Sequence, residues 1–289
     1  MKVVRFQHSK HGDRPPQIGT LEGDHVLAPP GLPDDLPALL GTADPAVLGI
    51  GRGERTPLVE VRLLAPVGRP PKFLAIGLNY AAHAAESTMK RPDYQLWFNK
   101  QSTCVVGPGD PIEIPRASSY VDYEGELAFV IGRRCRHVPA ERAAEVVFGY
   151  TIVNDVSVRD WQRRTPTMTM GKSFDTHGPM GPWLVTRDEL GDPHRLHLRT
   201  WVNDELRQDA STEDLIYNCW EMVEHLSTAF TLEPGDVVST GTPAGVGFAM
   251  DPPHWLAAGD RVRIEIDGLG TLENPVIDEP ADDPIGLSS

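Results

Sequence analysis

Residues 123–130 read YEGELAFV, and this stretch says more about the fold than any other part of the chain. Two glutamates, Glu124 and Glu126, flank one glycine and lead into an apolar run at 127–131. On a β-strand, alternate side chains point to the same face, so both carboxylates should project together, roughly 7 Å apart. Because the apolar run belongs in a core, the acids should lie at its mouth. Carboxylates there need a nearby cation or a raised pKa.

A second predicted strand supplies a third acid. Residues 149–156 read GYTIVNDV, are rich in β-branched side chains and carry Asp155 near their end. Strands that follow one another in sequence often pair, so Asp155 should join the two glutamates. Three carboxylates with open water positions suit Mg²⁺ or Mn²⁺ better than zinc or copper. The alternative is that these acids are solvated on an exposed strand, where acids protect sheet edges.

The remaining patterns predict a strand-rich α+β protein without regular βαβ alternation. The clearest helix should start at Ser211 or Thr212, because apolar residues then recur every three or four positions. That apolar stripe comprises Leu215, Cys219, Met222, Leu226 and Phe230. A Pro/Gly-rich linker at 68–71 separates a small N-terminal domain, 1–68, from a larger domain, 69–279, and we expect the tail at 280–289 to be disordered.

Composition excludes several classes of protein. The 289 residues have a net charge of −14, which disfavours nucleic-acid binding. The apolar runs are too short for a membrane span or a signal peptide, so we expect a cytoplasmic protein with no membrane partner. The three cysteines form no CxxC, which argues against a disulfide framework or a thiolate zinc site. An anionic substrate would need local positive charge in so acidic a protein.

Further candidate site residues surround the three acids. Arg159 and Lys172 offer positive charge, and Gln162 offers a hydrogen-bonding amide. His83 and Glu86 stand three residues apart on a predicted helix, the arrangement of a general base oriented by a carboxylate. Most such pairs are surface salt bridges. The glycine-rich turn at 240–247 exposes backbone N–H groups to an anion, or needs its glycines only for a tight loop.

Seven motifs in order resemble the fumarylacetoacetate hydrolase family over 72–276. They are GxNYxxHxxE, DYExELAxVIG, GYTxxNDxSxRDxQ, GKSFDT, GPW, LxPGDVxxTGTPxGVG and GDxVxxEIxGxGxLxN. The resemblance implies a mixed β-sandwich roll with a small N-terminal α/β domain, and a homodimer. It also implies one Mg²⁺ or Mn²⁺ per subunit on Glu124, Glu126 and Asp155. The dyad of His83 and Glu86 would act with Lys172 and Gln162, and the substrate contacts would be Arg159, Thr242, Tyr80 and Gly241.

One departure narrows the expected activity. The larger fumarylacetoacetase branch has an extra metal-binding Asp where this chain has residues 76–79, so the small bacterial, acylpyruvase-like branch fits better. The resemblance then implies hydrolysis of a C–C bond in an acylpyruvate-type 2,4-dioxo acid, giving pyruvate, or a substituted pyruvate, and a carboxylic acid. Decarboxylation of an oxaloacetate-like acid, isomerisation of a 2-hydroxyhepta-2,4-diene-1,7-dioate-like acid and tautomerisation stay open, because all begin with a chelated 2-oxo acid. A catalytically silent member that binds metal and 2-oxo acid is a further alternative.

Overall fold

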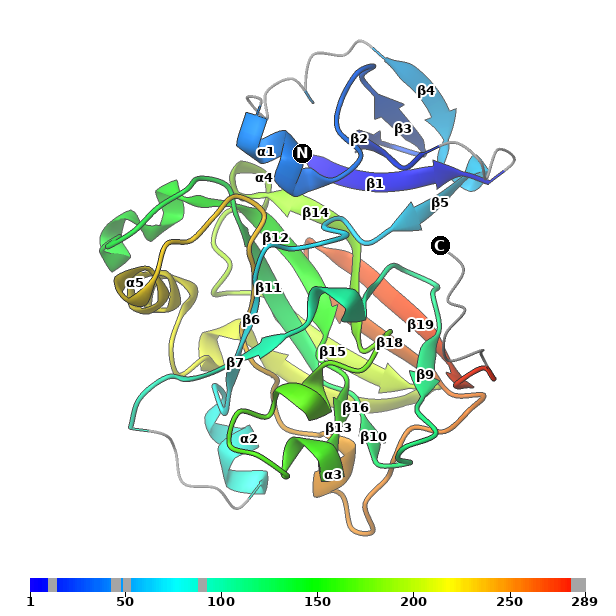
Figure 1. Cartoon of the computed structure of the whole chain (residues 1–289), viewed down its shortest axis with the longest axis vertical. Helices are drawn as coiled ribbons and strands as arrows, with labels where there is room; N and C mark the ends of the chain where they lie inside the picture. The colour runs from blue at the N-terminus through cyan, green and yellow to red at the C-terminus, as the bar shows by residue number, and fades with distance from the viewer. Residues whose placement is uncertain (10–14, 43–47, 49–52, 88–92, 282–289) are drawn as a thin grey trace.

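The computed structural model describes residues 1–9, 15–42, 48, 53–87 and 93–281. In this part of the chain, twelve strands form one large mixed sheet (Figure 1). Its main path runs β4 (Glu54–Pro57), β3 (His25–Ala28), β2 (Gln17–Glu22), β1 (Lys2–His8), β14 (Gly178–Thr186), β12 (Val147–Asn154), β11 (Gly125–Ile131), β17 (Val237–Ser239), β6 (Phe73–Gly77) and β7 (Leu96–Lys100). Two further strands branch from this path, β5 (Val61–Leu64) on β1 and β8 (Val105–Val106) on β14.

A second sheet of five strands packs beside the first. Its order is β16 (Glu205–Ser211), β15 (His197–Val202), β18 (Arg261–Ile266), β19 (Gly270–Asp278) and β9 (Ile112–Ile114). A short ladder joins β10 (Val121–Asp122) to β13 (Ser157–Val158). The pairings of β17 with β6 and of β19 with β9 are parallel, whereas most others are antiparallel. The prediction of a strand-rich α+β fold with mixed sheets is therefore confirmed.

The helices of the described residues are short. The α-helices are α1 (Leu36–Thr42), α2 (Ala81–Glu86), α3 (Arg159–Gln162), α4 (Arg187–Leu190) and α5 (Cys219–Ala229). The 3-10 helices are η2 (Leu58–Glu60), η3 (Ser102–Cys104), η4 (Ala140–Glu145), η5 (Thr169–Lys172), η6 (Thr212–Asp214) and η7 (Gly247–Ala249). In Figure 1, α2 and α3 lie together at the end of the molecule opposite the N-terminal strands. No helix among the described residues has the length and apolarity to cross a bilayer.

Strand β11 is buried along its whole length because both faces of the large sheet are covered. Leu127 and Phe129 point into the larger hydrophobic core, which also holds residues of the second sheet and α5. Ala128 and Val130 point the other way, into a core that includes Val3 and other N-terminal residues. The predicted strand is confirmed, and its double burial explains the absence of polar residues after Glu126.

The long helix begins later than its apolar stripe predicts. Asn218 caps α5: its side chain accepts hydrogen bonds from the amides of Trp220 and Glu221, while Glu221 bonds back to the Asn218 amide. This capping box fixes the start of a helix more strongly than apolar spacing does. Ser211 instead ends β16 and caps η6. Leu215, predicted to be helical, forms an isolated β-bridge with Tyr80, and Phe230 lies just beyond the helix.

The predicted tail at 280–289 is described only to residue 281, so most of it lies outside the described residues. The three cysteines are unpaired, as their number and spacing predict.

His177 provides a test of the fold. It is completely buried, and its Nε2 donates a hydrogen bond to the carbonyl of Glu113 at 2.8 Å. Burial lowers the pKa of His177 to about 4 from 6.5, although the bond to Glu113 acts in the opposite direction. Between these values the unfolded chain binds a proton that the native protein does not. The free energy of unfolding is therefore fully retained above about pH 6.5 and should fall by about 3 kcal/mol as the pH approaches 4.

Urea denaturation from pH 7 to pH 4 measures this dependence. We expect His177→Gln to flatten the pH profile by that amount relative to the wild-type protein, while substitution of the exposed His225 by Gln leaves the slope unchanged. Equal slopes for H177Q and the wild-type protein would contradict the assignment.

Candidate active site and metal centre

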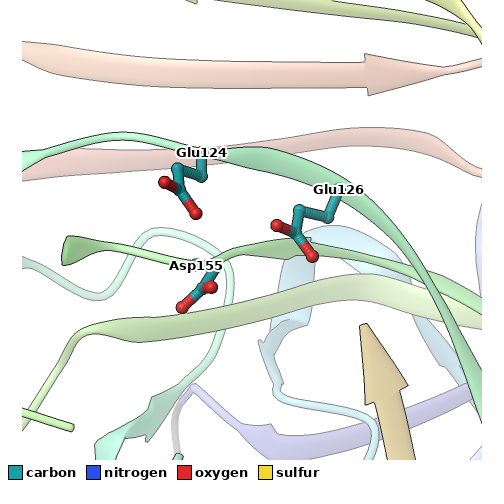
Figure 2. A group of neighbouring side chains, drawn as sticks. All are labelled: Glu124, Glu126 and Asp155. Atoms are coloured by element: carbon teal, nitrogen blue, oxygen red, sulfur yellow. The ribbon is translucent and has the colours of Figure 1, made fainter. Parts of the chain in front are cut away.

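The pairing of β11 with β12 brings the three predicted acids together. Glu124 directly precedes β11, and Asp155 directly follows β12. The amide of Asp155 donates to the carbonyl of Glu124 at 2.9 Å, so these residues lie opposite each other. Residues directly opposite across an antiparallel pair project from the same face. Figure 2 shows the carboxylates of Glu124, Glu126 and Asp155 pointing toward one another, with one oxygen of each inside a 4.8 Å cluster.

Close packing against the second sheet requires a glycine, Gly125, between the two glutamates. A Cβ at this position would lie 2.2 Å from Thr200 Oγ1 and 3.2 Å from Gln208 Oε1, on strands β15 and β16. The Gly125 amide also donates to Gln208 Oε1 at 3.0 Å. The second sheet therefore approaches the β11 backbone on the face opposite the carboxylates. A side chain at this position would collide with the second sheet, which is why only a glycine fits between the two glutamates.

Two buried lysines neutralise part of the acidic cluster. Lys172 Nζ lies 2.6 Å from Glu124 Oε2 and 2.8 Å from Asp155 Oδ2. Lys100, at the end of β7, places its Nζ 2.7 Å from Asp155 Oδ1. The sequence pointed to Lys172 but not to Lys100, because no motif connects residue 100 to residue 155. The structure shows that Lys100 holds one oxygen of Asp155 and so orients the carboxylate.

Arg159 is also occupied by carboxylates. Its Nε lies 2.9 Å from Asp122 Oδ2, and one terminal nitrogen lies 2.6 Å from Glu124 Oε1. Asp122 additionally accepts hydrogen bonds from the amides of Gly247 and Phe248. The sequence analysis missed Asp122, although its alternation with Glu124 and Glu126 was a usable signal. Arg159 therefore ties the acidic strand to η7.

Glu126 carries the charge that these cations leave without a partner. Four buried carboxylates, those of Asp122, Glu124, Glu126 and Asp155, face three buried cationic side chains, those of Lys100, Lys172 and Arg159. Among the described residues, Glu126 forms no ion pair and accepts hydrogen bonds only from Ser239 Oγ at 2.5 Å and the Gly241 amide at 2.9 Å.

The pKa shifts follow this arrangement. Burial, together with repulsion by Asp155 and Glu124, raises the pKa of Glu126 well above its ordinary value. Burial opposes ionisation of Glu124 as well, but Lys172 and Arg159 outweigh it, so the pKa of Glu124 lies below its ordinary value. The pKa values of the two glutamates thus shift in opposite directions because, among the described residues, only Glu124 forms ion pairs.

These residues fit a hard divalent cation. The donor set is entirely carboxylate oxygen, as Mg²⁺ and Mn²⁺ prefer, and the cluster has one anionic group more than its side-chain cations balance. A divalent ion on these carboxylates would lie close to the Lys172 ammonium and repel it, which would weaken the pairing of Lys172 with Glu124 and Asp155. That ammonium would then be available for another anion.

His83, which is buried, and Glu86, which is half-buried, form a pair on α2. His83 Nδ1 lies 2.7 Å from Glu86 Oε1, and Glu86 Oε2 accepts a hydrogen bond from the Gly245 amide at 2.8 Å. His83 is 6% exposed, so this pair differs from the surface salt bridge that the spacing alone would favour. Because Nδ1 is engaged, Nε2 is the ring nitrogen available for proton transfer.

One cavity of about 410 Å³ joins the dyad to the acids. Seven of the predicted residues line it: His83, Glu124, Glu126, Arg159, Gln162, Lys172 and Thr242. Asp155 and Glu86 do not line the cavity, but each contacts a residue that does: Asp155 pairs with Lys172, and Glu86 with His83. Its apolar wall contains Leu78, Leu96, Phe98, Met168 and Phe248.

Two predicted substrate contacts, Gly241 and Tyr80, lie beside this cavity and do not line it. The Gly241 amide donates to Glu126, as described above, and the next residue, the lining Thr242, donates from Oγ1 to the carbonyl of Gly125 at 3.0 Å. The Tyr80 hydroxyl is buried without a hydrogen-bond partner among the described residues. The glycine-rich turn thus presents its backbone N–H groups to Glu126 and Glu86.

Known proteins are similar to this chain in sequence and fold. The family model "Fumarylacetoacetate (FAA) hydrolase C-terminal" matches residues 72–277, and the model "Rv2993c-like, N-terminal" matches residues 1–66. Oxaloacetate tautomerase fahd2, mitochondrial, of Xenopus laevis is 46% identical over 220 residues, which cover 75% of this chain and 69% of that protein.

Two solved structures are similar over nearly the whole chain. One is 2-hydroxyhepta-2,4-diene-1,7-dioate isomerase from Mycobacterium marinum, with a TM-score of 0.80, 36% identity and coverage of 97% of this chain and 100% of that one. The other is maleylpyruvate hydrolase from Sphingobium sp. SYK-6 in complex with manganese(II) ion and pyruvate, with a TM-score of 0.77, 33% identity and the same coverage. Since the first family model spans most of the residues, the chain belongs to the fumarylacetoacetate hydrolase family.

Proposed function

We propose that this protein is a Mg²⁺- or Mn²⁺-dependent hydrolase that cleaves a C–C bond in an acylpyruvate-type 2,4-dioxo acid. The observation that carries the proposal is the shared cavity. His83 lines it together with Glu124 and Glu126 of the carboxylate centre, so a water-activating base and a site for a 2-oxo acid share one cavity. A similar solved structure, the maleylpyruvate hydrolase, holds manganese and pyruvate, the 2-oxo acid that such a cleavage would release.

Each residue has a defined part in this reaction. Held by Glu124, Glu126 and Asp155, the metal ion would supply the Lewis acidity that stabilises negative charge on the 2-oxo acid. His83 Nε2 takes a proton from water, whose oxygen adds to the distal carbonyl carbon C4. Glu86 holds the imidazole in position. The C3–C4 bond breaks and C3 takes up a proton, which gives pyruvate, or a substituted pyruvate, and a carboxylic acid.

Lys172 and Gln162 support the same reaction. Once the Lys172 ammonium leaves one of its carboxylates, it can donate hydrogen bonds to the developing oxyanion, where preorganised donors contribute most. Gln162 lines the cavity; its Oε1 accepts from Arg159 at 3.0 Å, and its amide nitrogen has only a weak contact with Met168 Sδ at 3.6 Å, so the nitrogen is the group that can donate to a substrate oxygen.

A second candidate is tautomerisation of oxaloacetate. The Xenopus laevis relative carries that name and is 46% identical to this chain. The same His83 could move a proton at C3 without admitting water as a nucleophile. Product analysis by NMR on acylpyruvates and oxaloacetate separates the two reactions, because only hydrolysis yields a new carboxylic acid.

Metal binding can be tested without turnover. We expect Glu126→Gln to abolish the rise in melting temperature that Mn²⁺ or Mg²⁺ gives the wild-type protein, because the variant lacks both a ligand and the uncompensated charge. A hundredfold excess of ligand over Kd stabilises a native protein by about 2.7 kcal/mol. The matched control is Glu86→Gln, which should keep the metal-induced shift. An undiminished shift in E126Q would remove this residue from the metal site.

The role of the dyad can be tested by turnover. We expect His83→Ala to lower kcat for an acylpyruvate by about 10²-fold or more, measured as loss of the enol absorbance, because the variant has no base for the attacking water. The metal-induced rise in melting temperature should persist in this variant, and His225→Ala should keep full activity. Near-wild-type turnover by H83A would exclude His83 as the general base.

A further inference from the structure

The proposed substrate is an anion, yet the buried cations of the cavity floor are already paired with carboxylates. Arg159 is held by Asp122 and Glu124, and Lys172 by Glu124 and Asp155. These side chains are at most 4% exposed. The floor can therefore accept one acidic group, through the metal ion and the released lysine. Among the described residues, the floor has no further unpaired cation that could bind a second acidic group.

Arg163 is a different kind of cation. It lines the same cavity but is exposed, so it stands at the rim whereas the acids lie at the floor. Among the described residues it forms no ion pair. Its guanidinium carbon lies 5.4 Å from the centre of the Phe248 ring, which also receives Arg159 at 4.5 Å. Its amide bonds back to the Arg159 carbonyl at 3.3 Å, which anchors its backbone at the end of α3.

Arg164, the next residue, differs from Arg163 in both its ion pairing and its position. Arg164 is paired with Asp160 at 3.5 Å and stacks over Trp161 at 3.8 Å. It does not line the cavity. The two arginines are adjacent and both exposed, but only Arg163 lines the cavity, and only Arg164 has an ion-pair partner among the described residues.

The walls between floor and rim are mainly apolar. Leu78, Leu96, Phe98 and Met168 line the cavity together with Phe248. The cavity thus has an acidic floor for the metal ion, apolar walls and a cationic rim. This arrangement matches a molecule with a 2-oxo acid at one end and a carboxylate at the other. A neutral acyl chain would leave the guanidinium of Arg163 without an anionic partner, whereas a carboxylate would form a charge-assisted, potentially bidentate pair with it.

We infer that Arg163 determines specificity by binding a second, terminal carboxylate of the substrate at the cavity rim. This inference rests on the proposed function, because it takes the 2-oxo acid to lie at the carboxylate centre. Arg163 is a recognition residue and takes no part in bond cleavage.

Calorimetric binding of two six-carbon 2-oxo acids to the Mn²⁺-loaded protein tests the inference. The pair is 2-oxoadipate, with a terminal carboxylate, and 2-oxohexanoate, with a terminal methyl group. Neither has the 4-oxo group needed for cleavage. We expect the wild-type protein to bind 2-oxoadipate about tenfold more tightly, as one charge-assisted contact allows. In Arg163→Met the affinity for 2-oxoadipate should fall to that for 2-oxohexanoate, which itself should not change.

The matched control is Arg164→Met, which removes an equal charge one residue away and should keep the preference for 2-oxoadipate. Arg163→Lys should keep part of it. An undiminished preference in R163M, or an equal loss in R164M, would overturn the inference and leave the proposed function standing. If the wild-type protein binds neither compound, the proposed function fails and the inference fails with it.

Discussion

The antiparallel register of β11 on β12 is the constraint on which the site depends. It sets Glu124 opposite Asp155 and places Glu126 one pair further along the same face. A slip of one residue would turn both glutamates toward the second sheet and Gly125 toward the cavity. Thr200 and Gln208 fill the space against Gly125, so the slipped register would force carboxylates into a packed interface. The core therefore protects the geometry of the centre.

Charge balance determines what this geometry can hold. The protein buries four carboxylates beside three cationic side chains, and burial of an uncompensated carboxylate is costly. The carboxylate left without a cationic partner among the described residues is that of Glu126, which accepts hydrogen bonds from a hydroxyl and a backbone amide. A divalent ion would reverse the sign of the cluster and so create affinity for an acid. In a protein with a net charge of −14, that local reversal is what permits an anion to bind.

Sequence reasoning succeeded where a local rule determined the outcome. Alternation along a strand placed Glu124 and Glu126 on one face, and the predicted strand pairing brought Asp155 to them. It failed where contacts join distant residues. Lys100 reaches Asp155 only through the tertiary fold, and the apolar stripe from Leu215 could not reveal that Asn218 starts the helix.

The arginines near the site differ in their ion pairing, which the sequence does not reveal. Arg159 looked like a free cation for the substrate, but its partners are Asp122 and Glu124. Arg163 and Arg164 are indistinguishable as sequence letters, and only their neighbours show that one is paired with Asp160. Ion pairing depends on which side chains meet in three dimensions, which a pattern along the chain does not record.

The pairing of β1 with β14 joins the N-terminal stretch, residues 1–66, to the sheet of the larger stretch, residues 72–277. Lys2 pairs with Val185, and Val3 with Leu184, so the first strand continues the large sheet. Val3 and Ile18 share a hydrophobic core with Ala128 and Val130, which lie directly behind the catalytic strand. Truncating the first 66 residues would uncover the back face of β11 and leave the Leu184–Val185 end of β14 unpaired and open to intermolecular pairing. The N-terminal stretch thus supports the strand that carries the acids, although it contributes no residue to the site.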